Sequence, residues 1–241
     1  MTAVAEVPAA SAPVAAEATT SEEVALERAT KWANEYAARL TERTMSRLAE
    51  VAGHSNGVQA HIGEPTTGSP ATGFYVAFDV AATSPIQFGG PPPYQPSKVI
   101  AAGQSAFIVA FIYVNPTVNI PLGWAVPASI QLGGRTWRMT LDQGNLTTGT
   151  VLPHQVRTAT FATPAATLTP VIFSLATPNP GADPWLIEAN LTVYVDSPAQ
   201  PFAAFATKFL DLDNDPGVPF FPPVNAGWRY ELPNRYLIYT S

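Results

Sequence analysis

Residues 106–114 read AFIVAFIYV, nine apolar residues without a charge or a glycine. A strand with one face in water alternates apolar and polar residues, because successive side chains point to opposite faces of the sheet. This stretch has no polar row, so it predicts a strand that is buried on both faces. Nine residues also fall short of the ~20 that a membrane-spanning helix needs.

The sequence around this stretch has the period of two that half-buried strands show. Residues 74–80 alternate in this way, and so do residues 185–195 (WLIEANLTVYV). Many short strands joined by Gly/Pro-rich turns are typical of a sandwich, jelly roll or barrel. The sequence therefore predicts a mainly β fold, an antiparallel β-sandwich or jelly roll of about eight strands. The other expected strands lie at residues 128–132, 135–141, 156–162, 171–176, 202–210 and 235–240.

Glycine and proline punctuate the expected strands. Gly133-Gly134 is a two-residue signal for a tight hairpin between residues 128–132 and 135–141, because such turns need positive φ. Of the 25 prolines, 23 follow Gly53. Proline lacks a backbone N–H, so these residues limit the lengthening of strands and pairing at their edges.

The N-terminal part of the chain has a different pattern. Residues 1–19 are rich in Ala, Pro and Thr and predict an extended arm, and residues 20–52 predict one long amphipathic α-helix. Thr20 and Glu23 form a capping box at its start. We expect a linker at 53–72 and one β-sandwich domain at 73–241. The apolar stripe of the helix has spacings of three and four and comprises Ala25, Ala29, Trp32, Tyr36 and Leu40, continued by Met45 and Leu48.

Charge is concentrated near the N-terminus. The first 52 residues carry 5 basic and 8 acidic residues, whereas the 189 residues from Gly53 onward carry only 7 basic and 10 acidic ones. The second part is thus about 9% charged, against the ordinary ~25%. The cores of subunit interfaces are depleted in charge, so we expect copies of the same chain to cover much of the β domain. The net charge of −6 argues against polyanion binding by the whole surface.

One loop has the pattern of a cation site. Asp211, Asp213 and Asp215 alternate in the segment DLDNDPG, and carboxylates at alternate loop positions are how calcium acquires oxygen ligands. The segment is similar to the start of an EF-hand or dockerin-type loop. Its glycine comes one residue late, however, and Pro222 stands where a bidentate glutamate is needed. A solvated turn remains the alternative interpretation.

The histidines and aromatic residues are weaker candidates. His54, His61 and Glu64 are of types suited to zinc, but they lie in a Gly/Ser/Thr/Pro-rich connection, and we interpret them as loop residues without a metal. The third histidine is His154, and a Ser-His-Asp triad is defined by geometry rather than by composition. Five aromatic residues could stack on sugars or act as core and interface anchors: Tyr94, Trp124, Trp137, Trp185 and Trp228.

Three arginines follow one helix stripe. Arg39, Arg43 and Arg47 stand at i, i+4 and i+8, a spacing that allows a local contact with nucleic-acid phosphates. The alternative is a solvated face with paired charges, because Glu35 precedes Arg39 by four residues, as Glu27 precedes Lys31.

These features carry one class-level resemblance. In its short strands, Pro-rich loops and few charges, with an arm and a helix ahead of the β domain, the chain resembles the single jelly-roll coat proteins of small non-enveloped viruses. The resemblance covers residues 73–240 and implies a capsid-forming subunit. Many such proteins have a basic arm that binds RNA, whereas this arm has no Lys or Arg before Arg28. Genome charge would then be balanced by the arginine stripe, small cations or polyamines.

Three classes of function remain. The first is a self-assembling structural subunit, a viral coat protein whose partner is itself, with nucleic acid enclosed and the arm and helix contacting neighbouring subunits. The second is a β-sandwich module that binds carbohydrate or protein, and the third is a hydrolase on a β scaffold. We prefer the first. A coat protein needs no catalytic residues and no cofactor, apart from the calcium that the aspartate loop would bind. It does not associate with a membrane, and it is found in the virion or in the host cytoplasm. Without a signal peptide, the other two classes would be cytoplasmic.

Overall fold

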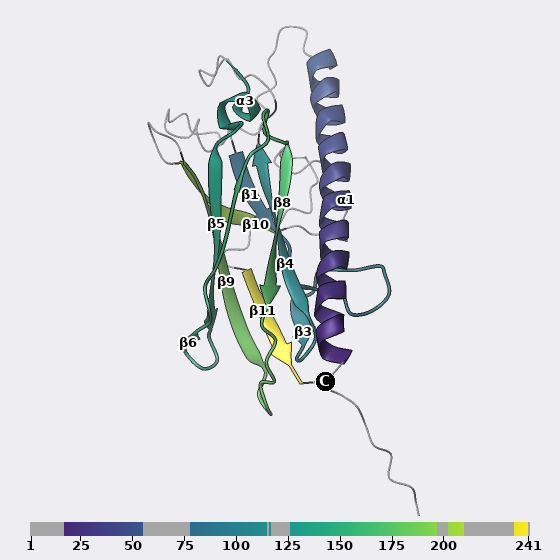
Figure 1. Cartoon of the computed structure of the whole chain (residues 1–241), viewed down its shortest axis with the longest axis vertical. Helices are drawn as coiled ribbons and strands as arrows, with labels where there is room; N and C mark the ends of the chain where they lie inside the picture. The colour runs from purple at the N-terminus through teal and green to yellow at the C-terminus, as the bar shows by residue number, and fades with distance from the viewer. Residues whose placement is uncertain are drawn as a thin grey trace, which may run out of the picture.

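One long helix and two β-sheets form three layers (Figure 1). The structure, a computed structural model, describes residues 17–54, 78–114, 116, 126–196, 202–209 and 234–240. Within these ranges two peptide bonds, Pro92–Pro93 and Thr163–Pro164, are cis. The elements are α1 (Glu17–His54), β1 (Phe78–Ala82), β2 (Ile86–Gln87), β3 (Val99–Ala101), β4 (Ala106–Val114), α3 (Ala128–Leu132), β5 (Thr136–Asn145), β6 (Thr150–Val151), β7 (Gln155–Thr160), β8 (Leu168–Leu175), β9 (Trp185–Val195), β10 (Phe202–Phe209) and β11 (Asn234–Tyr239).

Each sheet is built around one long strand. In sheet A, β4 lies between β8 on one side and β1 and β2 on the other. In sheet B, β9 lies between β5 on one side and β10 and β11 on the other, with β7 and β6 beyond β5 and β3 beyond β11. The predicted strands at 106–114 and 185–195 are confirmed residue for residue.

Strand β10 joins the two sheets. Its first half pairs antiparallel with β9, and its second half pairs parallel with β1. Strands β3 and β11 are also parallel. The mainly β fold with one long N-terminal helix is confirmed, although the sandwich is not antiparallel throughout. The jelly-roll strand order stays a prediction.

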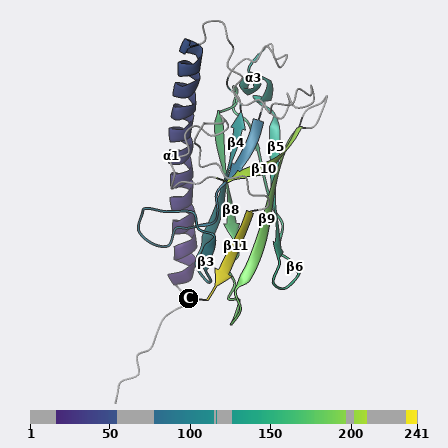
Figure 2. The same ribbon diagram turned by 180° about the vertical axis from the view of Figure 1, so that it is seen from behind.

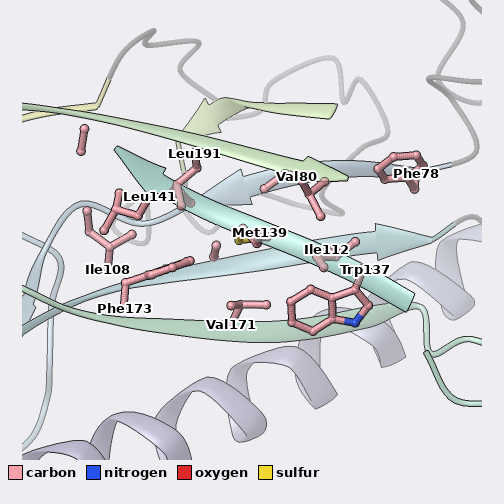
Figure 3. Packing of buried hydrophobic residues seen from close by; sticks show 14 of the residues in the cluster. Phe78, Val80, Ile108, Ile112, Trp137, Met139, Leu141, Val171, Phe173 and Leu191 are labelled. Atoms are coloured by element: carbon pink, nitrogen blue, oxygen red, sulfur yellow. The ribbon is translucent and has the colours of Figure 1, made fainter. Parts of the chain in front are cut away.

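The space between the sheets holds the larger core. Figure 3 shows Trp137, Met139 and Leu141 of β5 facing residues of β4 and β8. This arrangement follows from the alternation along β5, where each buried side chain is followed by a more exposed one. The inward row of β4 completes this core with Ala106, Ile108, Ala110, Ile112 and Val114.

A second core lies between sheet A and α1. The other row of β4, residues Phe107, Val109, Phe111 and Tyr113, packs there against the helix. All nine residues of β4 are buried, which confirms the prediction of a strand covered on both faces. In Figures 1 and 2, α1 runs along the length of the sandwich beside this sheet.

Aromatic rings connect α1 to the sheet. Trp32 and Tyr36 stack with ring centroids 5.1 Å apart, and Tyr36 lies 5.5 Å from Phe111. Phe88, just after β2, contacts Trp32 and Phe107 at 6.1 and 5.8 Å. Such ring pairs add about 0.5–1.5 kcal/mol each beyond the burial of their area. The apolar stripe of the helix is therefore covered by the chain's own sheet.

Thr83 fills the gap between β1 and β2. Its N–H donates to the Val109 carbonyl at 2.9 Å, and its Oγ1 accepts from the Val109 N–H at 3.1 Å. The Thr83 carbonyl in turn accepts from Asn234 Nδ2 at 2.9 Å. Thr83 thus pairs both backbone groups of the buried Val109 at the point where the partner of β4 changes from β1 to β2.

The hairpin predicted at Gly133-Gly134 is wrong, because residues 128–132 form the short helix α3. The Pro127 carbonyl accepts from the N–H groups of Ile130 and Gln131 at 3.0 and 3.2 Å and starts this turn. Ala128 and Leu132 then point into the core, four residues apart. A five-residue apolar run has no period that separates a strand from a helix.

Two details of α1 also differ from the prediction. The helix begins at Glu17, so Thr20 lies inside it and is not its N-cap. The buried stripe runs through Ala25, Ala29, Ala33, Tyr36, Ala37, Leu40 and Thr44, whereas Met45 is exposed. The 3.6-residue period brings Thr44, rather than Met45, onto the inward face four residues after Leu40.

Candidate functional surface

The outer face of sheet B is open to solvent and has no net charge. Residues directly opposite each other on paired strands point to the same side of a sheet, and the register pairs Arg138 with Thr158 on β7 and with Tyr194 on β9. We call this surface the threonine face. It comprises Val99, Thr136, Arg138, Thr140, Asp142, Val156, Thr158, Thr160, Glu188, Asn190, Thr192, Tyr194, Arg235, Leu237 and Tyr239.

The charged residues of the threonine face have partners nearby. Arg235 donates two hydrogen bonds to one oxygen of Glu188, at 2.9 and 3.1 Å. The guanidinium of Arg138 lies 5.7 Å from the Tyr194 ring centroid. Asp142 lies 3.1 Å from His154 Nδ1. The two basic and two acidic residues of the face sum to zero, and its other eleven residues are threonine, tyrosine, asparagine, valine and leucine.

Strand β7 forms one border of this surface and also seals the side of the sandwich. Gln155 Nε2 donates to the Ser174 carbonyl at 2.6 Å, and Arg157 Nε donates to the Ile172 carbonyl at 3.2 Å. The Arg157 guanidinium also lies 5.3 Å from the Phe173 ring centroid. Side chains of β7 therefore satisfy carbonyls of β8, which would otherwise be open to pairing with another strand.

A polar pair lies at the inner side of the same sheet. Gln143 Nε2 donates to the hydroxyl of the buried Tyr236 at 2.6 Å. Burial raises the pKa of Tyr236 well above its ordinary value, and the hydrogen bond from Gln143 offsets a smaller part of this rise. The phenol therefore stays neutral in the folded chain at pH values where a free tyrosine ionises.

Replacing Tyr236 by phenylalanine tests this pair. At neutral pH the change leaves the Gln143 amide unpaired, and we expect a loss of about 1–3 kcal/mol in unfolding free energy. Below about pH 10 neither state of wild type loses the phenol proton, so Tyr236 adds no pH dependence there. Above pH 10 only the unfolded state ionises, and stability falls toward the folded pKa by up to ~1.4 kcal/mol per pH unit.

Urea unfolding between pH 7 and 11 measures both effects. The alkaline loss should be shallower in Tyr236→Phe than in wild type, whereas Tyr239→Phe, at an exposed tyrosine, should follow wild type. Parallel pH curves for wild type and Tyr236→Phe would contradict the assignment.

The structure describes the side chains of two of the three arginines in the stripe. Arg39 and Arg43 are exposed on α1, and Arg47 lies further along the same helix, where its backbone alone is described. The Arg39 guanidinium lies 5.5 Å from the Tyr36 ring centroid, and Glu35 lies 4.0 Å from Lys31. Contact with nucleic acid stays a prediction.

The other sequence candidates separate into core residues and residues outside the described ranges. Trp137 is buried between the sheets and Trp185 packs against that core, so both are core anchors. Tyr94 is partly buried and lies 4.7 Å from Phe88. His54 ends α1. Residues outside the described ranges are Asp211, Asp213, Asp215, His61, Glu64, Trp124 and Trp228, and the calcium site stays a prediction.

The pair formed by His154 and Asp142 has the imidazole–carboxylate contact of a catalytic triad, but both side chains are more than half exposed. No hydroxyl group of the described residues is hydrogen-bonded to His154. Within the same ranges, no three His, Asp or Glu side chains gather where a metal ion could be held. Neither helix there is both long enough and apolar enough to cross a membrane.

Comparison with known proteins does not assign a function to the threonine face. No protein-family model matches the chain, and no curated protein matches it.

Proposed function

We propose that this chain is a self-assembling structural subunit, a coat protein that forms a shell, and that the threonine face is one of the surfaces its copies share. The observation that carries the proposal is how charge is divided between the two outer faces. The outward side of α1 is densely charged, whereas the threonine face holds four charges with partners. Among the α1 side chains that the structure describes, the exposed charges are Glu22, Glu23, Glu27, Arg28, Lys31, Glu35, Arg39, Glu42 and Arg43.

The size of the threonine face favours an assembly with several contacts per subunit. Strands lie ~4.8 Å apart and rise ~3.3 Å per residue, so five strands with six residues of rise span roughly 400 Å². A standard pairwise interface buries about 800 Å² on each partner. The threonine face alone supplies about half of this area. A stable assembly therefore needs further contact surfaces on each subunit, as a closed shell has.

The packing of α1 decides which of its sides can contact a neighbouring subunit. Its apolar stripe is buried against sheet A, so any neighbour would meet its charged side. Such contacts weaken as salt rises, because exposed charges are screened over ~8–10 Å at physiological ionic strength. In a shell that encloses nucleic acid, Arg39 and Arg43 would be the residues of this side that contact phosphates, although Glu35 and Glu42 lie beside them.

Purified protein tests the proposal directly. Size-exclusion chromatography with light scattering should show a large homo-oligomer of defined mass, and negative-stain electron microscopy should show particles of uniform size. The measurement should cover low and high salt, pH 5–8, and buffers with and without divalent ions. A monomer in all of these conditions would refute self-assembly.

A further inference from the structure

Strand β7 is an edge of sheet B, and one side of its backbone has no partner strand in the described part of the chain. The strand pairs with β5 alone. In an antiparallel pair, residues that bond to the partner strand alternate with residues whose N–H and C=O groups point away from it. The Phe161 N–H donates to the Arg135 carbonyl at 3.0 Å, so the odd-numbered residues bond to β5. Val156, Thr158 and Thr160 therefore turn their backbone groups outward.

Two other strand edges are closed by the chain itself. At β3, the Gln87 side chain makes hydrogen bonds to both backbone groups of Ala101, at 3.0 and 3.1 Å. At β8, Pro170 has no N–H, and side chains of β7 bond to two carbonyls of the strand. Such devices protect exposed edges from pairing with another chain. Strand β7 contains no proline, and no described side chain bonds to the backbone of residues 158–160.

The outward row of β7 can pair with a second copy of itself. In an antiparallel pair centred on Thr158, this residue lies opposite its own equivalent, and Val156 lies opposite Thr160 of the partner subunit. Each such pair exchanges two N–H···O=C bonds, so the ladder holds about six. The Val156 carbonyl already accepts from Arg157 Nη1 at 3.1 Å, but a carbonyl oxygen has two lone pairs and can accept a second bond. The contact is isologous, with a two-fold axis at Thr158.

The side chains of β7 suit this pairing on both faces of the strand. On the outer face, threonine meets threonine at the axis and valine meets threonine beside it, and cross-strand pairs of this kind stabilise a sheet. On the inner face, Arg157 lies opposite Ala159 of the partner subunit. Ala159 is small and exposed, so it leaves room for a guanidinium that is already bonded to β8. Within the paired residues, no charge lies directly opposite another charge.

We propose that β7 pairs antiparallel with β7 of a second copy, so that sheet B continues from one subunit into the next. The proposal rests on the self-assembly proposed above and specifies one contact within it. It also brings the threonine faces of the two copies onto one continuous sheet. Two faces of roughly 400 Å² then form one of roughly 800 Å², which is the standard size of one side of an interface.

A single introduced cysteine tests the pairing, because the chain has none of its own. Opposite residues of a hydrogen-bonded antiparallel pair have Cα atoms ~5.5 Å apart, a distance that a disulfide spans. Under mild oxidation, Thr158→Cys should therefore give a disulfide-linked dimer on a non-reducing gel. Thr136→Cys is the matched control, exposed on the same face but one strand further from the edge. Its two copies would lie at least ~14 Å apart and should not link.

A proline at the axis tests the role of the backbone. Thr158→Pro removes the outward N–H but no hydrogen bond to β5, so the subunit should stay folded, as prolines on edge strands allow. Its assembly, followed by light scattering, should need at least about ten times the protein concentration of wild type. Val151→Pro, at an exposed position of β6 outside the pairing, should assemble as wild type does.

The outcomes separate this contact from self-assembly in general. If wild type assembles but Thr158→Cys links no better than Thr136→Cys, the pairing is wrong and self-assembly stands. The same holds if folded Thr158→Pro assembles at the wild-type concentration. Loss of assembly in Thr158→Pro without a cross-link in Thr158→Cys would mean that another segment covers β7, which also overturns the pairing. A wild-type monomer under every condition would refute both proposals. If Thr158→Pro unfolds, the two cysteine variants decide.

Discussion

Replacing Phe111 by alanine is expected to lower the free energy of unfolding by about 3–5 kcal/mol. Phe111 is fully buried in the row of β4 that faces α1, and its ring lies 5.5 Å from that of Tyr36. The change removes the ring and leaves a cavity between helix and sheet. In a chain of this size each kcal/mol shifts the melting temperature by roughly 2–4 °C, so a drop of roughly 6–20 °C should appear in a thermal scan.

Two further variants locate this effect. Phe111→Leu still fills most of the site and should cost less. Ile108→Ala, on the opposite row of the same strand, should cost about 2–5 kcal/mol through the core between the sheets. Hydrogen exchange should rise in α1 for Phe111→Ala at temperatures where α1 stays protected in Ile108→Ala. Equal protection of α1 in the two variants would contradict a separate helix–sheet core.

Placing charge on the threonine face is expected to abolish assembly without unfolding the subunit. Thr158 and Thr160 are exposed on β7, so Thr158→Lys/Thr160→Lys should change the stability of the free subunit by no more than about 1 kcal/mol per site, repulsion from Arg138 included. Between copies the same lysines lose water and lack partners, which costs several kcal/mol. A cost of about 3 kcal/mol raises the dissociation constant of a contact more than 100-fold.

Light scattering across a concentration series measures this shift. Ala182→Lys adds one such charge at an exposed turn outside the threonine face and should assemble as wild type does. Thr158 lies opposite Arg138 on β5, so the sheet itself offers no counter-charge to a lysine introduced there. If the double variant assembles at the same concentration as wild type, the interface does not include the threonine face. Self-assembly through another surface would then still be possible.

The local elements could be predicted where the side-chain pattern allows one solution. Nine apolar residues in β4 and eleven alternating ones in β9 fix a strand and its two faces, and β7, β8, β10 and β11 lie within a few residues of their expected positions. The helix stripe was predictable as far as Leu40. The helix at residues 128–132 could not be predicted, because a short buried apolar run is compatible with a strand or a helix. The hydrogen bonds that the Pro127 carbonyl accepts make it a helical turn.

The threonine face could be anticipated only in part. Alternation shows that Arg138 and Tyr194 point away from the cores of their strands, but not that they lie opposite each other, 56 residues apart in the chain. The contact between Glu188 and Arg235 likewise depends on the pairing of β9 with β11, 47 residues apart, whereas Asp142 and His154 are only 12 residues apart. Charge depletion was the reason to expect a covered surface, and the pairing of strands shows which side chains share the outer face of sheet B.

The two parallel strand pairs also determine how late in folding the sheets can be completed. Strand β1 pairs with β10 and β3 with β11, so early segments wait for partners more than 120 residues later. Contacts so distant in sequence slow folding and leave strand edges open meanwhile. During synthesis the sandwich closes only after residues 234–239 have left the ribosome. A chain that stops before them leaves the edges of β3 and β9 that β11 covers without a partner, and open edges of this kind favour aggregation.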